Sequence, residues 1–206
     1  MKFKTEQEIF WASEFGDEYI ERNKSERLLA SNVSFFVKAL RAAGRVESVI
    51  EFGSNVGMNL RALSILFPGI EKYAIEINKK ASLQLIDFLG EDYVFNGSIF
   101  DYQTDKSYDL SMSKGVLIHI NPDMLEIAYK KLYESSNKYI LISEYYNPSP
   151  VSINYRGNED KLYKRDFCGD IMELYPDLEL LDYGFCYKKD PAFSQDDITW
   201  FLMRKS

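Results

Sequence analysis

The order of strand-like and helix-like segments is the feature that most constrains the fold of this chain. Residues 46–52 (VESVIEF) are short and β-branched, which is typical of a buried strand, and a helical pattern follows at 57–66. Strand-like segments near 72–77, 93–96, 108–114 and 138–146 then alternate with helical patterns at 78–89 and from Asn121 onward. Repeated alternation of this kind predicts a parallel sheet with helices on both faces.

The two ends of the chain depart from this alternation. Two strand-like segments, 178–187 and 198–204, are separated by about ten residues with a proline and no helical pattern. A parallel crossover needs a dozen or more residues, so we expect these strands to be antiparallel neighbours. At the other end, Thr5 and Glu8 form a capping box for a helix over 5–22, and Ser25 caps a second helix that ends near Gly44. We therefore predict one domain, 1–206, with a helical cap at 1–44, an α/β core at 45–206 and a polar, aromatic insertion or lid near 148–167.

Composition excludes several classes of function. The 206 residues carry 25 Lys and Arg against 32 Asp and Glu, a net charge of −7, which argues against nucleic-acid and anionic-membrane binding. The single histidine rules out a multi-histidine metal site, and the two cysteines form no disulfide framework, so we expect a cytoplasmic protein without a metal. No apolar run suits a membrane helix or a signal peptide. The 15 Tyr, 14 Phe and 2 Trp indicate a pocket with amphipathic walls.

The turn after the first strand, Glu51-Phe52-Gly53-Ser54-Asn55-Val56-Gly57, is the main candidate for ligand binding. In open α/β sheets, ligands bind where the carboxyl ends of strands meet the amino ends of helices. Glu76 ends the second strand, where its carboxylate can accept hydrogen bonds from the hydroxyls of a ribose. Together these features predict a site for an adenosine-type cofactor.

The same turn restricts which cofactor fits. A dinucleotide fingerprint, G-x-G-x-x-G, fails because Asn55 and Met58 stand at its second and third glycine positions, and no GK[ST] of a P-loop occurs. Glu51 would repel a pyrophosphate but attract a cation. S-adenosylmethionine has no phosphate and carries a sulfonium and an ammonium group, so it fits this pattern.

This arrangement resembles the seven-stranded, class I S-adenosylmethionine-dependent methyltransferases over about residues 46–205. The resemblance implies a three-layer sandwich whose mostly parallel, Rossmann-like sheet of seven strands ends in an antiparallel hairpin. It also implies that the cofactor, with S-adenosylhomocysteine as product, contacts four segments of the chain. These are the turn (Glu51, Gly53, Ser54, Asn55, Gly57) under the methionine part, Glu76 and Ile77 at the ribose, Ser98 and Ile99 beside the adenine, and Lys114 and Gly115 at the methyl-transfer centre.

Three blocks give a narrower resemblance. TEQEIFWASEFGDEYIERN, EFGSNVGMNL and KGVLIHINPD together are similar to methylases associated with pseudaminic acid (nonulosonic sugar) biosynthesis. The resemblance implies a small acceptor such as a sugar or a nucleotide-linked sugar. The middle glycine of the commoner E/D-x-G-x-G-x-G pattern is Asn55 in this chain.

Two residues are candidates for catalysis. His119 is the only histidine and follows the fourth strand near the expected centre, so it is a candidate general base for an oxygen or nitrogen acceptor. The alternative is a structural histidine bonded to a backbone carbonyl. Tyr146, just after the fifth strand, is the second catalytic candidate.

Aromatic and polar residues on either side of this centre are candidates for cofactor and substrate contacts. Trp11, Phe15 and Tyr19 lie about four residues apart and share a helical face, which either covers the cofactor, with Tyr19 toward the substrate, or simply packs on the domain. The remaining substrate candidates follow the fifth strand: Tyr145, Asn147, Tyr155 and Arg156. The Arg156 guanidinium suits a carboxylate or a phosphate.

Other functions stay open at this stage. One is methylation of another metabolite, a protein or tRNA, although the acidic charge disfavours RNA. Others are a non-catalytic S-adenosylmethionine-binding module and a nucleotide-binding oxidoreductase. The sequence does not indicate an oligomeric state.

Overall fold

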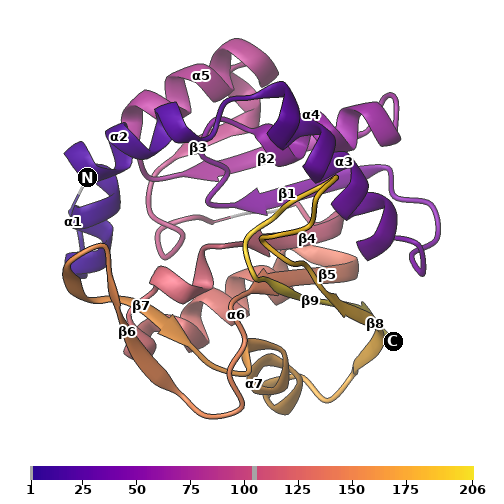
Figure 1. Ribbon diagram of the computed structural model, residues 1–206. Coiled ribbons are helices and arrows are strands. Elements are labelled where there is room, and N and C mark those ends of the chain that lie inside the picture. Colours follow the sequence, from indigo (N-terminus) through magenta and orange to yellow (C-terminus); the bar gives the residue numbers. More distant parts are fainter. Residues whose placement is uncertain (1, 104–105) are drawn as a thin grey trace.

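A seven-stranded mixed sheet forms the centre of the computed structural model, which describes residues 2–103 and 106–206 (Figure 1). The strand order is β3-β2-β1-β4-β5-β9-β8. The strands are β1 (Ser48–Phe52), β2 (Glu71–Glu76), β3 (Val94–Asn96), β4 (Tyr108–Lys114), β5 (Ser136–Glu144), β8 (Leu178–Phe185) and β9 (Thr199–Lys205). The first five are parallel, and β9 pairs antiparallel with both β5 and β8. The predicted parallel sheet and its antiparallel end are confirmed.

Helices cover both faces of the sheet, so the expected three layers are present (Figure 1). Helices α3 (Glu26–Ala39), α4 (Met58–Leu66) and α5 (Lys79–Leu89) pack on one face, and α6 (Leu125–Glu134) and α7 (Phe167–Leu174) on the other. Neighbouring side chains of β1 point to opposite faces of the sheet: Val49 packs with α3 and α4, whereas Ile50 packs with α6. Short 3-10 turns η1 (Glu91–Tyr93), η2 (Leu117–His119) and η3 (Pro122–Met124) complete the connections.

The expected single helix over 5–22 is wrong, because the chain bends at Ser13. It forms α1 (Glu6–Ala12) and α2 (Glu14–Arg22), with Ser13 in an extended conformation between them. The bend folds α2 so closely against the end of α1 that a Cβ on Gly16 would lie 1.9 Å from the carbonyl oxygen of Trp11. The predicted capping box of Thr5 and Glu8 is present at the start of α1.

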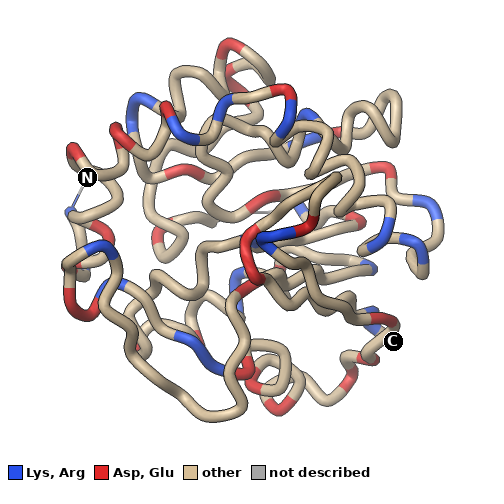
Figure 2. The backbone as a smooth tube through the Cα atoms, viewed as in Figure 1, with Lys and Arg blue, Asp and Glu red and all other residues tan. Residues whose placement is uncertain are grey.

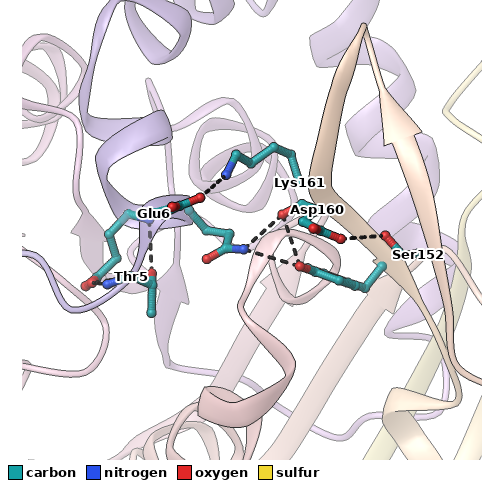
Figure 3. Close-up of polar contacts among 8 residues, drawn as sticks. Thr5, Glu6, Ser152, Asp160 and Lys161 are labelled. Carbon is teal, nitrogen blue, oxygen red and sulfur yellow. Dashed lines mark hydrogen bonds and ion pairs between the residues drawn. The ribbon is translucent and has the colours of Figure 1, made fainter.

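The segment predicted as an insertion near 148–167 contains a separate two-stranded hairpin. Its strands, β6 (Val151–Tyr155) and β7 (Asn158–Lys164), pair antiparallel outside the main sheet. The hairpin lies at the same end of the sheet as α1 (Figure 1). Figure 3 shows the contacts that join them: Lys161 pairs with Glu6 at 3.3 Å, and a side-chain amide of α1 donates to the carbonyl oxygen of Asp160 at 2.9 Å.

Charged residues of both signs are spread over the elements of the fold (Figure 2). Ion pairs such as Lys80–Asp17 at 2.6 Å and Arg204–Glu179 at 2.6 Å join cations to nearby carboxylates. None of the helices in the described part of the chain has both the length and the apolarity that crossing a bilayer requires.

Candidate functional site

The turn after β1 has a left-handed backbone at three alternating positions. The φ angles are +74° at Gly53, +47° at Asn55 and +77° at Gly57. A Cβ on Gly53 would lie 2.5 Å from Cγ2 of Val116, so no side chain fits there. Asn tolerates positive φ better than most residues, which explains how Asn55 occupies a left-handed position where the commoner pattern has its middle glycine.

Glu76 is fixed beside this turn. Its Oε2 accepts a hydrogen bond from the backbone N–H of Asn55 and its Oε1 accepts one from the N–H of Asn78, both at 2.7 Å. Burial raises the pKa of the Glu76 carboxyl, although these backbone donors oppose the shift. The end of β2 therefore holds an oriented carboxylate next to the glycine turn.

Glu51 lies beneath the same turn with one oxygen unused. Oε1 accepts from the side-chain amide of Asn59 at 2.6 Å, whereas Oε2 is buried and has no hydrogen-bond partner. Burial raises the pKa of Glu51 to about 8, opposed by Asn59 and by the ammonium group of Lys114. Burial likewise lowers the pKa of Lys114, opposed first by Glu51. A carboxyl and an amine thus share this end of the site.

A pocket at the carboxyl ends of β1, β2 and β4 brings most of the predicted residues together. Its empty space is about 1230 Å³, including the part open to solvent. The predicted residues on its wall are Trp11, Tyr19, Gly53, Ser54, Asn55, Glu76, Ile77, Ser98, Ile99, Lys114, Gly115 and His119. Glu51 and Gly57 lie behind the wall, next to the lining residues Asn59 and Met58.

His119 faces this pocket in a defined tautomer. Its Nδ1 lies 2.5 Å from the carbonyl oxygen of Lys161 on β7. A carbonyl only accepts, so Nδ1 carries the hydrogen and Nε2 keeps its lone pair. Burial lowers the pKa of His119 to about 4, so the ring is neutral at pH 7. The carbonyl contact is the one expected of a structural histidine, and the pocket-facing position is the one expected of a base.

An aromatic cluster of Trp11, Phe15, Tyr19, His119 and Tyr155 joins the helical cap to the hairpin. The ring centroid of Trp11 lies 4.6 Å from that of His119 and 5.2 Å from that of Tyr19. Phe15 and Tyr155 lie behind them, 5.9 Å apart, and do not line the pocket. Burial raises the pKa of Tyr19 to about 12, so its hydroxyl stays protonated.

The residues predicted from the segment after β5 lie outside the pocket wall. Tyr146 is 42 % exposed and packs on Phe201, with ring centroids 6.1 Å apart, so its geometry gives no support to the catalytic role predicted for it. The chain leaves the sheet after Glu144, which turns Tyr146 toward β9. Asn147 donates to the carbonyl of Ser149 at 2.6 Å instead of lining the pocket.

Tyr145 and Arg156 are also absent from the wall of the pocket, although both lie near its aromatic cluster. Burial raises the pKa of the Tyr145 hydroxyl, and a hydrogen bond to Asp196 adds to the shift. The exposed Arg156 guanidinium lies 5.8 Å from the ring centroid of Tyr155. Both residues therefore lie beside the aromatic cluster and outside the wall of the pocket.

The sequence analysis did not identify Glu144, which shapes the loop that carries His119. Its Oε1 accepts from the hydroxyl of Ser113 at 2.7 Å and from the backbone N–H groups of Val116 and Leu117, both at 3.1 Å. Burial raises the pKa of Glu144 to about 7. The available signal was an acidic residue at the end of a buried strand, the same signal that identified Glu76.

The first helix also contributes unpredicted lining residues, among them Gln7 and Glu8. Each is buried and keeps one side-chain oxygen without a hydrogen-bond partner. The sequence analysis treated Glu8 only as a helix cap. Among the described residues, no group of three or more His, Cys, Asp and Glu side chains is placed to hold a metal ion.

Comparison with known proteins identifies the fold. No family model matches the sequence, and no curated protein matches it by sequence. A solved structure of Burkholderia thailandensis 1,6-didemethyltoxoflavin-N1-methyltransferase with S-adenosylhomocysteine superposes with a TM-score of 0.72 at 12 % identity, covering 97 % of this chain and 87 % of that one.

Two further structures agree with this result. Magnesium protoporphyrin IX methyltransferase from Synechocystis gives a TM-score of 0.68 at 12 % identity, covering 97 % of this chain and 98 % of that one. An S-adenosylmethionine-dependent methyltransferase from Clostridium acetobutylicum gives 0.63 at 10 % identity, covering 93 % and 98 %. This chain therefore has the fold of the class I S-adenosylmethionine-dependent methyltransferases, as the sequence predicted.

Proposed function

We propose that this chain is an S-adenosylmethionine-dependent methyltransferase that acts on a small molecule. The observation that carries the proposal is a pair of buried acceptor oxygens on the pocket wall, Oδ1 of Asn55 and of Asn59, with Oε2 of Glu51 buried behind them. None of them has a hydrogen-bond partner among the residues that the structure describes. Buried acceptors without a donor are costly, so the site is complementary to a ligand that brings several N–H donors.

The α-ammonium group of S-adenosylmethionine supplies such donors. The ammonium of Lys114, in the same pocket, is suited to its carboxylate, so the two charges of an amino acid each have a partner. The Glu76 carboxylate, with its two oxygens already oriented by backbone N–H groups, is suited to the ribose hydroxyls. Ser98 and Ile99 line the remaining side of the pocket, where the adenine would lie.

When bound, the cofactor supplies a methyl group on a positively charged sulfur. The protein then has to hold the acceptor in line with that methyl group and remove its proton. His119 is suited to the second task, because its Nε2 lone pair is free at neutral pH and its ring is fixed by the carbonyl of Lys161. Its pKa of about 4 makes it a weak base, so the proton would leave the acceptor as the new bond forms and not before.

We further propose that the acceptor is a sugar or a nucleotide-linked sugar of nonulosonic (pseudaminic) acid or surface-glycan biosynthesis. The similarity of the three sequence blocks supports this choice. Two features of the hairpin are consistent with it. Tyr155 belongs to the aromatic cluster, whose flat faces suit a sugar ring, and the exposed guanidinium of Arg156 next to it suits a carboxylate or phosphate.

Thermal unfolding in the presence of each candidate cofactor tests the proposal. S-adenosylmethionine or S-adenosylhomocysteine at about 100 times its dissociation constant should add about 2.7 kcal/mol of stability, while NAD should have no effect. A response to NAD alone would favour an oxidoreductase and end the proposal. The protein could instead bind S-adenosylmethionine but transfer no methyl group to nucleotide-linked sugars, other small metabolites, proteins or tRNA. That result would indicate a non-catalytic module.

A further inference from the structure

Glu8 has one carboxylate oxygen that the capping box does not use. Its Oε2 accepts from the backbone N–H groups of Lys4 and Thr5, the latter at 2.9 Å. Its Oε1 has no hydrogen-bond partner within residues 2–103 and 106–206, and the residue is only 7 % exposed. Since Glu8 lines the pocket, this oxygen is available to a ligand there and not to bulk water.

The position of Glu8 is fixed by contacts on three sides of α1. The ammonium of Lys4 pairs with Asp101 and lies 5.8 Å from the ring centroid of Phe100, so the start of α1 lies against the loop after β3. Gln7 donates to the carbonyl of Asp160 on the hairpin at 2.9 Å, and the carbonyl of Trp11 accepts from Asn78 at 3.3 Å. Since Glu8 is bonded to the backbone of Lys4 and Thr5, the start of α1 brings it toward the end of the pocket lined by residues 97–100.

Few other side-chain acceptors compete with Glu8. Gln7 also has an unpartnered oxygen among the described residues, but its amide is bonded to the carbonyl of Asp160 on the hairpin. The carboxylates among the described lining residues are Glu8 and Glu76, and the proposed function assigns Glu76, at the end of β2, to the ribose hydroxyls. The hydroxyl of Ser98 accepts from the N–H of Phe100 at 3.1 Å, and Asp101 is paired with Lys4. A hydrogen-bond donor of a ligand at this end of the pocket would therefore bond to Oε1 of Glu8.

We propose that Glu8 accepts a hydrogen bond from the exocyclic 6-amino group of the cofactor's adenine and thereby selects an aminopurine over an oxopurine. This inference rests on the proposed function, which places an adenine between Glu8 and the loop at Ser98 and Ile99. The amine donates N–H bonds, as a buried unpaired carboxylate oxygen requires. An oxopurine would present a carbonyl oxygen to the same carboxylate, and two acceptors repel each other.

Calorimetric titration with S-adenosylhomocysteine and S-inosylhomocysteine, which differ at the 6-position of the purine, tests the inference. Wild-type protein should bind the adenosyl compound at least tenfold more tightly. In Glu8→Gln the ratio should fall toward one, because a carboxamide keeps the capping box and can also donate to the oxopurine oxygen. Glu6→Gln, two residues earlier on α1 and exposed, is the matched control and should keep the wild-type ratio.

The outcomes separate the two proposals. If wild-type protein binds neither compound, the proposed function fails. A wild-type protein that binds the adenosyl and inosyl compounds with nearly equal affinity would refute the role of Glu8. An affinity ratio that is unchanged in Glu8→Gln would refute it as well, and the free oxygen of Glu8 would then bind another ligand group. A 6-deamino analogue of S-adenosylhomocysteine, measured on wild-type protein alone, gives an independent check should Glu8→Gln fold poorly. It should bind at least fivefold more weakly than the adenosyl compound, and equal affinity would refute the contact.

Discussion

Protonation of Glu51 should make cofactor binding depend on pH, and Glu51→Gln should weaken that dependence. With a pKa of about 8, the Glu51 carboxyl is mostly protonated at pH 7 when no ligand is bound. A cation next to Asn59, which bonds to Glu51 at 2.6 Å, favours the ionised form. Binding of the cofactor's ammonium group should therefore release a proton.

The size of the effect follows from the position of the carboxylate behind Asn59. A cation about 6 Å away, at an effective dielectric constant of about 20, stabilises the ionised form by about 2.8 kcal/mol, or about two pKa units. The pKa of Glu51 then falls from about 8 to about 6. At pH 7 the protonated fraction drops from about 0.9 to about 0.1, which is about 0.8 proton released. Because the ligand favours the ionised form, affinity rises with pH, by about tenfold between pH 5 and pH 7, where the ligand's ammonium group stays charged.

Calorimetry of S-adenosylhomocysteine binding at pH 7, in buffers with different ionisation enthalpies, measures this release directly. Glu51→Gln should release about 0.8 proton less than wild-type protein. Any release from Glu76, whose pKa is also raised, remains in both proteins and cancels. Glu47→Gln, an exposed residue just before the other end of β1, is the control and should match wild type. Equal release from Glu51→Gln and wild-type protein would refute the electrostatic coupling.

Three further predictions concern the same pocket. Asn55→Gly should change the free energy of unfolding in urea by less than about 1 kcal/mol. Asn55→Val should lower it by about 1–2 kcal/mol, because the backbone at position 55 has a φ of +47°. Equal losses in the two variants would show that the turn relaxes. Glu76→Ala should weaken S-adenosylhomocysteine affinity by about 1.5–3 kcal/mol in calorimetry, with Glu71→Ala at the far end of β2 as the unaffected control; intact affinity would exclude a ribose contact. His119→Ala should keep that affinity within about threefold but lower methyl transfer about 10²-fold in a labelled-methyl assay, and undiminished turnover would leave His119 a structural residue.

The main sheet and the glycine turn were predictable because their determinants are local. A β-branched run such as β1 is recognisable within five residues, and the short, helix-free link between β8 and β9 already excludes a parallel crossover. The positions of Gly53 and Glu76 follow from strand ends, which all meet at one edge of the sheet. The local pattern was therefore sufficient to predict that these residues meet at one end of the sheet, on the wall of one pocket.

Features that depend on contacts between distant segments were not predictable. The bend at Ser13 depends on close packing of Gly16 on the carbonyl of Trp11, which the amphipathic pattern of a single long helix does not reveal. Glu144 acts through backbone N–H groups 26 to 28 residues away in sequence. The β6–β7 hairpin was predicted only as an insertion: β6 (VSINY) alternates apolar and polar residues but is largely exposed, and β7 (NEDKLYK) carries no such alternation along its length.

Lys161 connects the helical cap, the hairpin and His119, but through two contacts of very different value. Its side chain pairs with Glu6, which is 85 % exposed, and exposed ion pairs contribute about 0–1 kcal/mol. Its backbone carbonyl accepts the Nδ1 hydrogen of the buried His119 ring, and that bond fixes the tautomer. The orientation of the proposed base therefore depends on the path of β7 and not on the Lys161 side chain. The same reasoning makes Glu6 a suitable control site on α1, since losing its ion pair should move neither Glu8 nor His119.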